Sequence, residues 1–216
     1  MIASDAKSAE IIRPILRGRD IKRYGYDFAD LWLINTHNGV KEKGIKPINI
    51  NDYPAIKNLL DPYYDILAKR TDKGQTPYNL RNCAYMDDFS KQKIVWGNLS
   101  LSSAFSMAPE GMYVNAPCPM IVPYNGYLLA VLNSKLGDWY IRQNGVTRNG
   151  GYFEYKPMFV EMLPVPIISM EEQDVLSKLV PTFSATSEEL SLIDEKIYKL
   201  YNLSSDEIAF IENLGQ

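Results

Sequence analysis

The sequence has very little histidine and cysteine, on which many catalytic and metal centres depend. A single histidine, His37, excludes an internal pair of catalytic histidines and a histidine-rich metal site. It lies in Asn35-Thr-His-Asn-Gly39, whose composition is that of a polar turn, so we interpret it as a turn residue. The two cysteines, Cys83 and Cys118, form no C-x-x-C motif and are too few for a disulfide framework. The sequence therefore predicts no metal site.

Long apolar runs are also missing. There is no secretory hydrophobic region, and the longest apolar runs are too short to cross a bilayer. We therefore expect a cytoplasmic protein with no membrane partner. Residues 1–10 are small and polar. Such a start is expected either of a piece of a longer polypeptide or of a free-standing subunit.

The usual catalytic motifs are absent. The sequence contains no G-x-G-x-x-G, no P-loop, no H-E-x-x-H and no Asn-Pro-Pro-Tyr. No Asp followed by Glu-x-Lys lies on an expected strand in the arrangement of a nuclease. The carboxylate pair Asp87-Asp88 precedes a lysine-bearing strand, and capping of a turn is a simpler role for it than metal binding. We expect no catalytic residues in this chain.

The net charge of −3 is unevenly distributed along the chain. Residues 170–216 carry a net charge of −7, so residues 1–169 carry +4. A mildly basic body fits a cationic patch on one face. The 15 tyrosines suit a wet interface, because each offers a stacking face and a polar end. The alternative is partly buried tyrosine along strand edges.

A basic motif spans residues 11–24, where apolar and cationic side chains alternate. Pro14 fits the first turn of a short helix that Gly18 would end, and Gly18 would also admit a close backbone approach. Three arginines could bind phosphates through bidentate hydrogen bonds from their guanidinium groups: Arg17, Arg19 and Arg23. The alternatives are a solvated basic turn or pairing of these arginines with Asp20 and Asp27.

Hydrophobic periodicity predicts a mixture of helices and short strands. The expected helices are 52–70, which Asp61-Pro62 would kink or split, 127–144, and one long helix over 170–201 that Pro181 would kink or break. Capping residues are expected at Ser169 and, with Glu207, at Ser204. The expected strands are 28–35, 93–96, 101–107, 111–115 and 119–123. The expected fold class is α/β (α+β): a mixed sheet followed by a long C-terminal helix and a short final helix.

Five segments, in order along nearly the whole chain, carry a family likeness. They are Ile15–Tyr24 (ILRGRDIKRY), Cys83–Trp96, Leu128–Tyr140, Gly150–Tyr152 with Phe159–Pro166, and Ile193–Ile208. Together they resemble the TaqI-like C-terminal specificity domain, or target recognition domain, of type IIG restriction-modification enzymes. The resemblance implies a target recognition domain over 1–168 and C-terminal packing helices over 169–216.

In that family one polypeptide joins a nuclease, an S-adenosylmethionine-dependent adenine methyltransferase and this recognition domain. The resemblance therefore implies that this chain recognises a sequence in double-stranded DNA, directing methylation and cleavage by domains of the same or a partner polypeptide. Those domains are absent from this chain. S-adenosylmethionine and Mg²⁺ are expected to bind there, and no cofactor is expected here.

Given that resemblance, three loops could meet DNA: Arg70–Arg81, Asn98–Ser106 and Arg142–Lys156. Arginine suits guanine, asparagine and glutamine suit adenine, and tyrosine can stack. The expected base contacts are Arg142, Gln143, Asn144, Arg148, Asn149, Tyr152 and Tyr155. The expected phosphate contacts are Arg17, Arg19, Lys22, Arg23, Arg70, Lys73, Arg81 and Lys156. The first four could instead contact the neighbouring methyltransferase domain. The alternative is a solvated loop over buried aromatic residues.

Two other functions fit the sequence. The acidic helix expected over 170–201 could dock a partner, which would make the chain a helical protein-interaction or specificity-subunit module without direct DNA readout. The aromatic-rich region could instead bind a small molecule in an enzyme that lacks the usual motifs.

Overall fold

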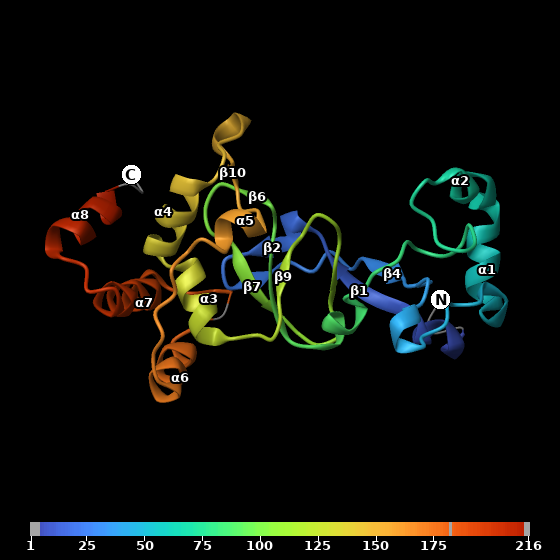
Figure 1. The fold of residues 1–216 in the computed structure, drawn as a ribbon, viewed down its shortest axis with the longest axis horizontal. Helices are drawn as coiled ribbons and strands as arrows, with labels where there is room; N and C mark the ends of the chain where they lie inside the picture. The colour runs from blue at the N-terminus through green and yellow to red at the C-terminus, as the bar shows by residue number, and fades with distance from the viewer. Residues whose placement is uncertain (1–4, 182, 214–216) are drawn as a thin grey trace. The chain divides into compact units, whose positions relative to one another are not determined.

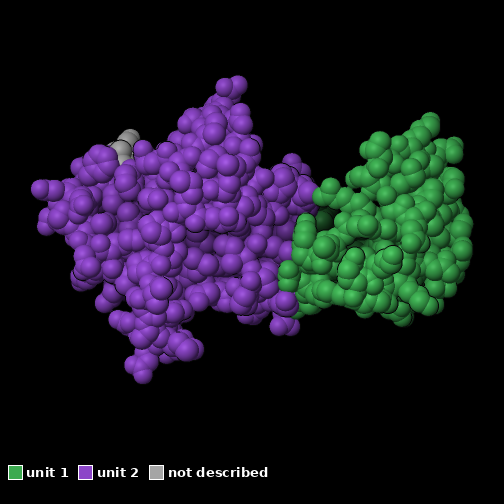
Figure 2. Space-filling model, in the orientation of Figure 1, with its two compact units in different colours: residues 1–15, 30–90, 111–113 green, residues 16–29, 91–110, 114–216 purple. Residues whose placement is uncertain are grey.

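The computed structural model describes residues 5–181 and 183–213, which form two compact units (Figure 2). Unit 1 comprises residues 5–15, 30–90 and 111–113, and unit 2 comprises 16–29, 91–110, 114–181 and 183–213. Helices and small sheets are mixed, which confirms the α+β class (Figure 1). The chain does not divide compactly at residue 168, because 169–181 and 183–213 belong to unit 2. A separate functional role for those residues stays a prediction.

Unit 1 contains one antiparallel strand pair and several short helices. Strand β1 (Ile12–Leu16), whose last residue belongs to unit 2, pairs with β4 (Trp32–Ile34), with Arg13 opposite Leu33. The core of unit 1 is formed by Ile11, Ile50, Tyr53 and Ile56. The helices of unit 1 are η1 (Ala6–Glu10), η3 (Lys41–Lys43), η4 (Ile50–Asp52), α1 (Pro54–Leu60), η5 (Asp61–Tyr63), α2 (Tyr64–Lys69) and η6 (Met86–Ser90).

The short helix expected around Pro14 is wrong, because this segment is strand β1. The Asn35 amide donates to the Ile11 carbonyl and the Ile15 amide to the Leu31 carbonyl. The residues of β1 that hydrogen-bond to β4 are therefore those at odd positions. Pro14 is at an even position, so its lack of an N–H costs no hydrogen bond to β4. The helix expected over 52–70 is split at Asp61-Pro62, as expected, and the strand expected over 28–35 is limited to β4.

The central sheet of unit 2 has the order β7-β5-β9 and is antiparallel throughout. Its strands are β5 (Lys93–Trp96), β7 (Phe105–Ala108) and β9 (Met120–Ile121). All four residues of β5 are buried, including Lys93, whose Nζ donates to the Pro109 carbonyl at 3.0 Å. The strand expected at 93–96 is thus confirmed.

Smaller strands and turns surround this sheet. Strands β2 (Ile21–Lys22) and β3 (Gly25–Tyr26) follow the turn η2 (Gly18–Asp20) and pair with each other. Strand β6 (Leu99–Ser100) pairs with β10 (Phe153–Glu154), and η7 (Asn149–Gly151) precedes β10. Strand β8 (Tyr113–Val114) has its first residue in unit 1 and its second in unit 2.

The helix expected over 127–144 is two helices, α3 (Gly126–Asn133) and α4 (Lys135–Asn144). The break falls at Ser134, whose Oγ accepts from the Gly137 amide and caps α4. Helix α3 is buried along most of its length and packs on β7 and on a later helix, α6. Its burial explains why its apolar residues form a continuous run. Helix α5 (Pro157–Val160) follows β10.

The single helix expected over 170–201 is wrong. The structure has α6 (Met170–Lys178) and α7 (Ser187–Leu200), with the break that Pro181 was expected to cause. The expected cap at Ser169 and the expected capping box of Ser204 with Glu207 are confirmed, and α8 (Ser205–Asn213) follows the latter. No helix in the described ranges is both long and apolar enough to span a membrane.

Candidate nucleic-acid interface

A cleft of about 620 Å³ in unit 2 gathers three separate stretches of the chain. They are residues 18–23 with η2 and β2, residues 97–104 with β6, and the loop 115–118, and Tyr152 joins them. The cleft is lined by three cations, Arg19, Lys22 and Arg23, and by several amide and hydroxyl side chains. These are the groups that contact a phosphate backbone and base edges.

Gly18 and Gly97 allow two segments of main chain beside this cleft to approach each other closely. A Cβ on Gly97 would lie 3.2 Å from the Gly18 carbonyl oxygen and 3.3 Å from the Gly18 Cα. A Cβ on Gly18 would lie 3.4 Å from both the Gly97 Cα and the Cys118 Sγ. The close approach expected of Gly18 is therefore made to the chain itself. It places the basic motif against the loop that follows β5.

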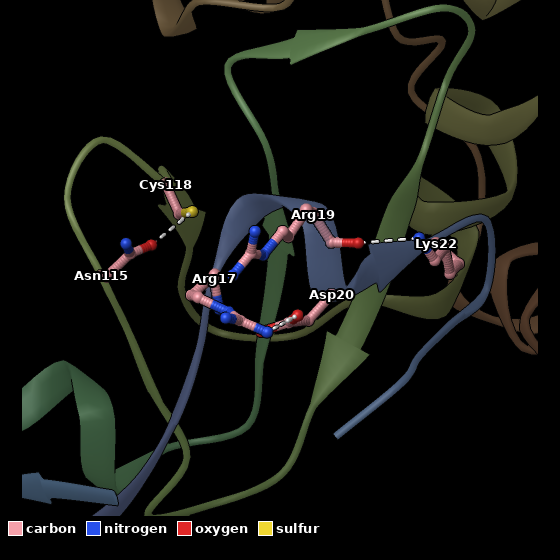
Figure 3. A network of polar contacts seen from close by, with 6 residues as sticks. All are labelled: Arg17, Arg19, Asp20, Lys22, Asn115 and Cys118. Atoms are coloured by element: carbon pink, nitrogen blue, oxygen red, sulfur yellow. Dashed lines mark hydrogen bonds and ion pairs between the residues drawn. The ribbon is translucent and has the colours of Figure 1, made fainter. Parts of the chain in front are cut away.

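Arg17 and Asp20 hold the turn that carries the cations (Figure 3). The Arg17 Nε and Nη2 donate to the two carboxylate oxygens of Asp20 at 2.9 and 2.7 Å, and the Arg17 amide donates to Oδ2. The hydrogen bonds from Arg17 lower the pKa of the buried Asp20 carboxyl. Pairing with Asp20, the alternative considered from the sequence, is thus the observed state of Arg17. Its contact with phosphate stays a prediction.

The remaining cations of the motif are differently engaged. Lys22 donates from Nζ to the Arg19 carbonyl at 2.7 Å (Figure 3). Arg23 donates from Nη2 to the Asn133 carbonyl at 2.6 Å, at the end of α3. Arg19 is exposed, and no side chain or carbonyl in the described ranges accepts a hydrogen bond from its guanidinium group. Arg19 is therefore available to a phosphate without breaking a hydrogen bond.

Cys118 also lines the cleft. Its Sγ donates to the Asn115 Oδ1 at 3.3 Å (Figure 3). Burial raises the pKa of the thiol to about 11, so it stays protonated at neutral pH. Its role in the cleft is to pack against Gly18.

Residues 146–154 form a hairpin beside the cleft. The Glu154 amide donates to the Val146 carbonyl at 3.0 Å, and the Arg148 amide to the Tyr152 carbonyl at 2.7 Å. Its tip, η7, projects from the body of unit 2 beyond β10 (Figure 1). Gly150 and Gly151 both have a φ of +77°, which other residues rarely adopt. The glycines thus form the tight turn, and they leave the neighbouring side chains in solvent.

The expected base contacts are not all at this tip. Arg148, Asn149 and Tyr152 are exposed there, and Tyr152 also lines the cleft. Arg142 and Gln143 line a different hollow against α8. The Arg142 guanidinium lies over the Phe153 ring at 4.1 Å and donates to Asp138 at 3.2 Å, while the Asn144 side chain donates to the Tyr140 carbonyl. The structure therefore separates the expected set into the hairpin tip and the end of α4.

The expected base contact of Tyr155 is wrong. Its side chain is 1% exposed, and its hydroxyl donates to the Asp138 Oδ1 at 2.5 Å. Burial, followed by the Asp138 charge, raises the pKa of this hydroxyl. Its main-chain amide donates to the Asn98 carbonyl and its carbonyl accepts from the Trp96 indole. Tyr155 is thus a core residue beneath the hairpin, which was the alternative for the aromatic residues of this loop.

Glu154 is a residue that sequence reasoning missed. Its carboxylate is 4% exposed and pairs with Arg148 and with Lys156, an expected phosphate contact, whose Nζ lies 2.8 Å from Oε2. Asn98 and Asn115 also line the cleft, and they too were not singled out. The only sequence signal for Glu154 was its place between two cations in an aromatic-rich loop.

The other expected phosphate contacts lie in unit 1. Arg70 donates from Nη2 to the carbonyls of Pro77 and Asn79, both at 3.0 Å, so it closes the loop 70–81. Lys73 donates to the Arg70 carbonyl, and Arg81 is exposed. His37 accepts the Gly39 amide at Nδ1, as a turn residue would. Contacts of Arg70, Lys73 and Arg81 with phosphate stay predictions.

No metal-binding cluster is present in the described ranges, where no three His, Cys, Asp or Glu side chains are grouped to hold an ion. The Asp87 carboxylate pairs instead with Lys43, and Asp87 and Asp88 lie in the first turn of the short helix η6.

Comparison with known proteins gives two findings. Residues 13–165 match the family model of the TaqI-like C-terminal specificity domain. The structure is similar, with a TM-score of 0.69 and 12% sequence identity, to that of the Type IIL restriction-modification enzyme MmeI, solved in complex with DNA. The match covers 98% of this chain and 31% of that chain, so this chain spans about a third of that protein. At this identity the likeness shows a shared fold, whereas the family match extends over most of the sequence. The chain belongs to the family of TaqI-like C-terminal specificity domains.

Proposed function

We propose that this chain is the target recognition domain of a restriction-modification enzyme. It binds a specific sequence in double-stranded DNA and directs adenine methylation and cleavage by methyltransferase and nuclease domains of the same or a partner polypeptide. S-adenosylmethionine and Mg²⁺ are assigned, as part of this proposal, to those catalytic domains.

The observation that supports this proposal most strongly is the convergence of Arg19, Lys22 and Arg23 on one cleft in a member of this family. Cations of this kind position a duplex through its phosphates. The hairpin tip next to the cleft offers Arg148 and Asn149, whose side chains suit guanine and adenine. The cleft thus supplies affinity, and the tip supplies discrimination.

Selection from a pool of random duplexes by the whole chain tests the proposal. We expect enrichment of one sequence, and an association constant whose logarithm falls linearly with the logarithm of salt concentration. Three phosphate contacts would give a slope of roughly −3. Failure to enrich any sequence at low salt would contradict the proposal.

A second candidate is a protein-docking module without DNA readout. Four large apolar side chains between α5 and the start of α6 are more than half exposed: Met158 at 63%, Met162 at 52%, Ile167 at 102% and Met170 at 79%. Exposed apolar side chains in such density are typical of protein contacts. This candidate expects no selection from the duplex pool, so the same experiment separates the two.

A further inference from the structure

Glu154 lies between two cations at the base of the hairpin. The Arg148 Nε donates to the Glu154 Oε1 at 2.6 Å, Nη2 donates to the same oxygen, and the Lys156 Nζ lies 2.8 Å from Oε2. Each carboxylate oxygen thus has its own cation. The hydrogen bonds from Lys156 and Arg148 lower the pKa of Glu154, so it is ionised at neutral pH.

The main chain of Glu154 is held on both sides by hydrogen bonds. Glu154 pairs with Leu99 across β6 and β10, and its amide donates to the Val146 carbonyl. The Glu154 side chain is 5% exposed, whereas that of Arg148 is 53% exposed. A carboxylate with little exposure, on a hydrogen-bonded stretch of main chain, therefore pairs with a largely exposed arginine. This differs from a pair of two mobile surface side chains, which contributes little.

One edge of the Arg148 guanidinium group is not used by Glu154. Nε and Nη2 face Glu154, while Nη1 donates to no acceptor within residues 5–181 and 183–213. The edge formed by Nη1 and Nη2 can therefore still donate to two acceptors. Guanine presents O6 and N7 in the major groove at the spacing that an arginine fork bridges.

We propose that Glu154 is a positioning residue, which holds Arg148 in one orientation to read a guanine. This inference rests on the proposed function and names a determinant of its specificity. An arginine held in one rotamer loses less conformational freedom when it binds DNA. Because its guanidinium group cannot reorient, a base other than guanine leaves its donors without acceptors. The opposite role, in which Glu154 competes with DNA for Arg148, predicts that removing the charge strengthens specific binding.

The test uses Glu154→Gln in the full chain, with the duplex that the wild type selects and every single-base-pair variant of it. Glutamine keeps the shape but removes the charge. We expect non-cognate binding to strengthen by a few fold. We expect discrimination to fall by about tenfold at one G·C pair, the pair that Arg148→Ala also affects, and to be unchanged at the other positions.

Two comparisons separate positioning from a general effect. Glu195→Gln, on the exposed face of α7, changes the net charge equally and should leave discrimination intact. In an Arg148→Ala background, Glu154→Gln should cause no further loss at that base pair, because the two residues act as one unit. If Glu154→Gln fails to fold by circular dichroism, Glu154→Asp, which withdraws the carboxylate from Arg148, should lose discrimination at the same position.

The outcomes are distinguishable. If the wild type selects a sequence and the folded Glu154 variant keeps full discrimination, or loses it equally at all positions, the positioning role is overturned and the proposed function stands. Tighter cognate binding by the variant also overturns it, in favour of competition. If the wild type selects no sequence, the proposed function fails, and this inference fails with it.

Discussion

Asn133 hydrogen-bonds to both main-chain groups of Phe105. Its Oδ1 accepts from the Phe105 amide at 3.0 Å, and its Nδ2 donates to the Phe105 carbonyl at 2.8 Å. Asn133 is the last residue of α3, and Phe105 begins β7, the edge strand of the central sheet. The Asn133 side chain thus pairs with the Phe105 amide and shares the Phe105 carbonyl with the Tyr24 amide, which donates to it at 2.9 Å.

Asn133→Ala should lower the free energy of unfolding by about 1–3 kcal/mol, because the buried Phe105 amide loses its partner and the Phe105 carbonyl loses one of its two donors. Urea denaturation measures this. Asn144→Ala is the matched control, since the Asn144 side chain makes one hydrogen bond, to the Tyr140 carbonyl on the same helix. If both variants lose the same free energy of unfolding, the hydrogen bonds from Asn133 to Phe105 do not stabilise the edge of the sheet.

Arg19→Ala should weaken binding to all duplexes by the same factor and reduce the magnitude of the salt slope by about 1. The reason is that Arg19 is exposed in the cleft and holds no internal hydrogen bond in the described ranges. Fluorescence titration across salt concentrations measures both effects. Thermal unfolding should be unchanged.

Arg17→Ala should behave differently from Arg19→Ala, because it removes the guanidinium group that pairs with the buried Asp20 carboxylate. We expect a lower melting temperature for this variant. A reversed result, in which Arg17 carries the salt dependence and Arg19 the stability, would refute the assignment of roles within the basic motif.

Tyr155→Phe should lower the free energy of unfolding by about 1–2 kcal/mol, since the hydroxyl donates to the Asp138 carboxylate in the core. The preferred DNA sequence of the folded variant should not change. Tyr152→Ala should do the opposite, weakening DNA binding while leaving stability unchanged, because Tyr152 is 43% exposed. Duplex selection with both variants would detect any readout by Tyr155.

Lys93→Met should flatten the pH dependence of stability between pH 8 and 10.5. Burial lowers the pKa of Lys93 from 10.5 to about 8, so across this window the unfolded chain binds more protons than the folded one. The free energy of unfolding of the wild type therefore rises with pH there, and the burial penalty is fully present below pH 8. We expect Lys93→Met to be about 1–3 kcal/mol more stable than the wild type at pH 7, with a smaller difference at pH 10.

Urea denaturation at several pH values gives this difference, and subtraction of the two curves removes the contribution of the tyrosines that both proteins share. Lys196→Met on the exposed face of α7 serves as control. A difference independent of pH would mean that Lys93 does not titrate in this range.

Local signals predicted the parts of the fold that depend on local chemistry. Strand β5 and the caps at Ser169 and Ser204 follow from apolar runs and from side chains that bond their own backbone. The short helix around Pro14 was wrongly predicted because proline fits both the first turn of a helix and a strand position that needs no N–H donor. The break at Ser134 was missed because the apolar pattern continues across it, and only the side-chain cap reveals it.

The candidate site was less predictable, because its walls are far apart in sequence. Arg19 and Lys22 were expected together as phosphate contacts. Both line one cleft, and their contact with phosphate stays a prediction. Arg17 could not be told from Arg19, since it is the folded turn that pairs Arg17 with Asp20 and leaves Arg19 exposed. Likewise Tyr152 and Tyr155 look alike in the sequence, yet the second packs in the core against Phe105. No local pattern reports such a contact.

The hairpin that carries Arg148 is held at its base by main-chain hydrogen bonds, from Glu154 to Val146 and from Tyr155 to Asn98. Main-chain bonds do not depend on the identity of the side chains between them. Exposed positions such as 147, 149 and 152 can therefore change without repacking the interior, provided that Gly150 and Gly151 remain. A lineage of such domains could acquire new target sequences by a few substitutions in this turn, at little cost to folding.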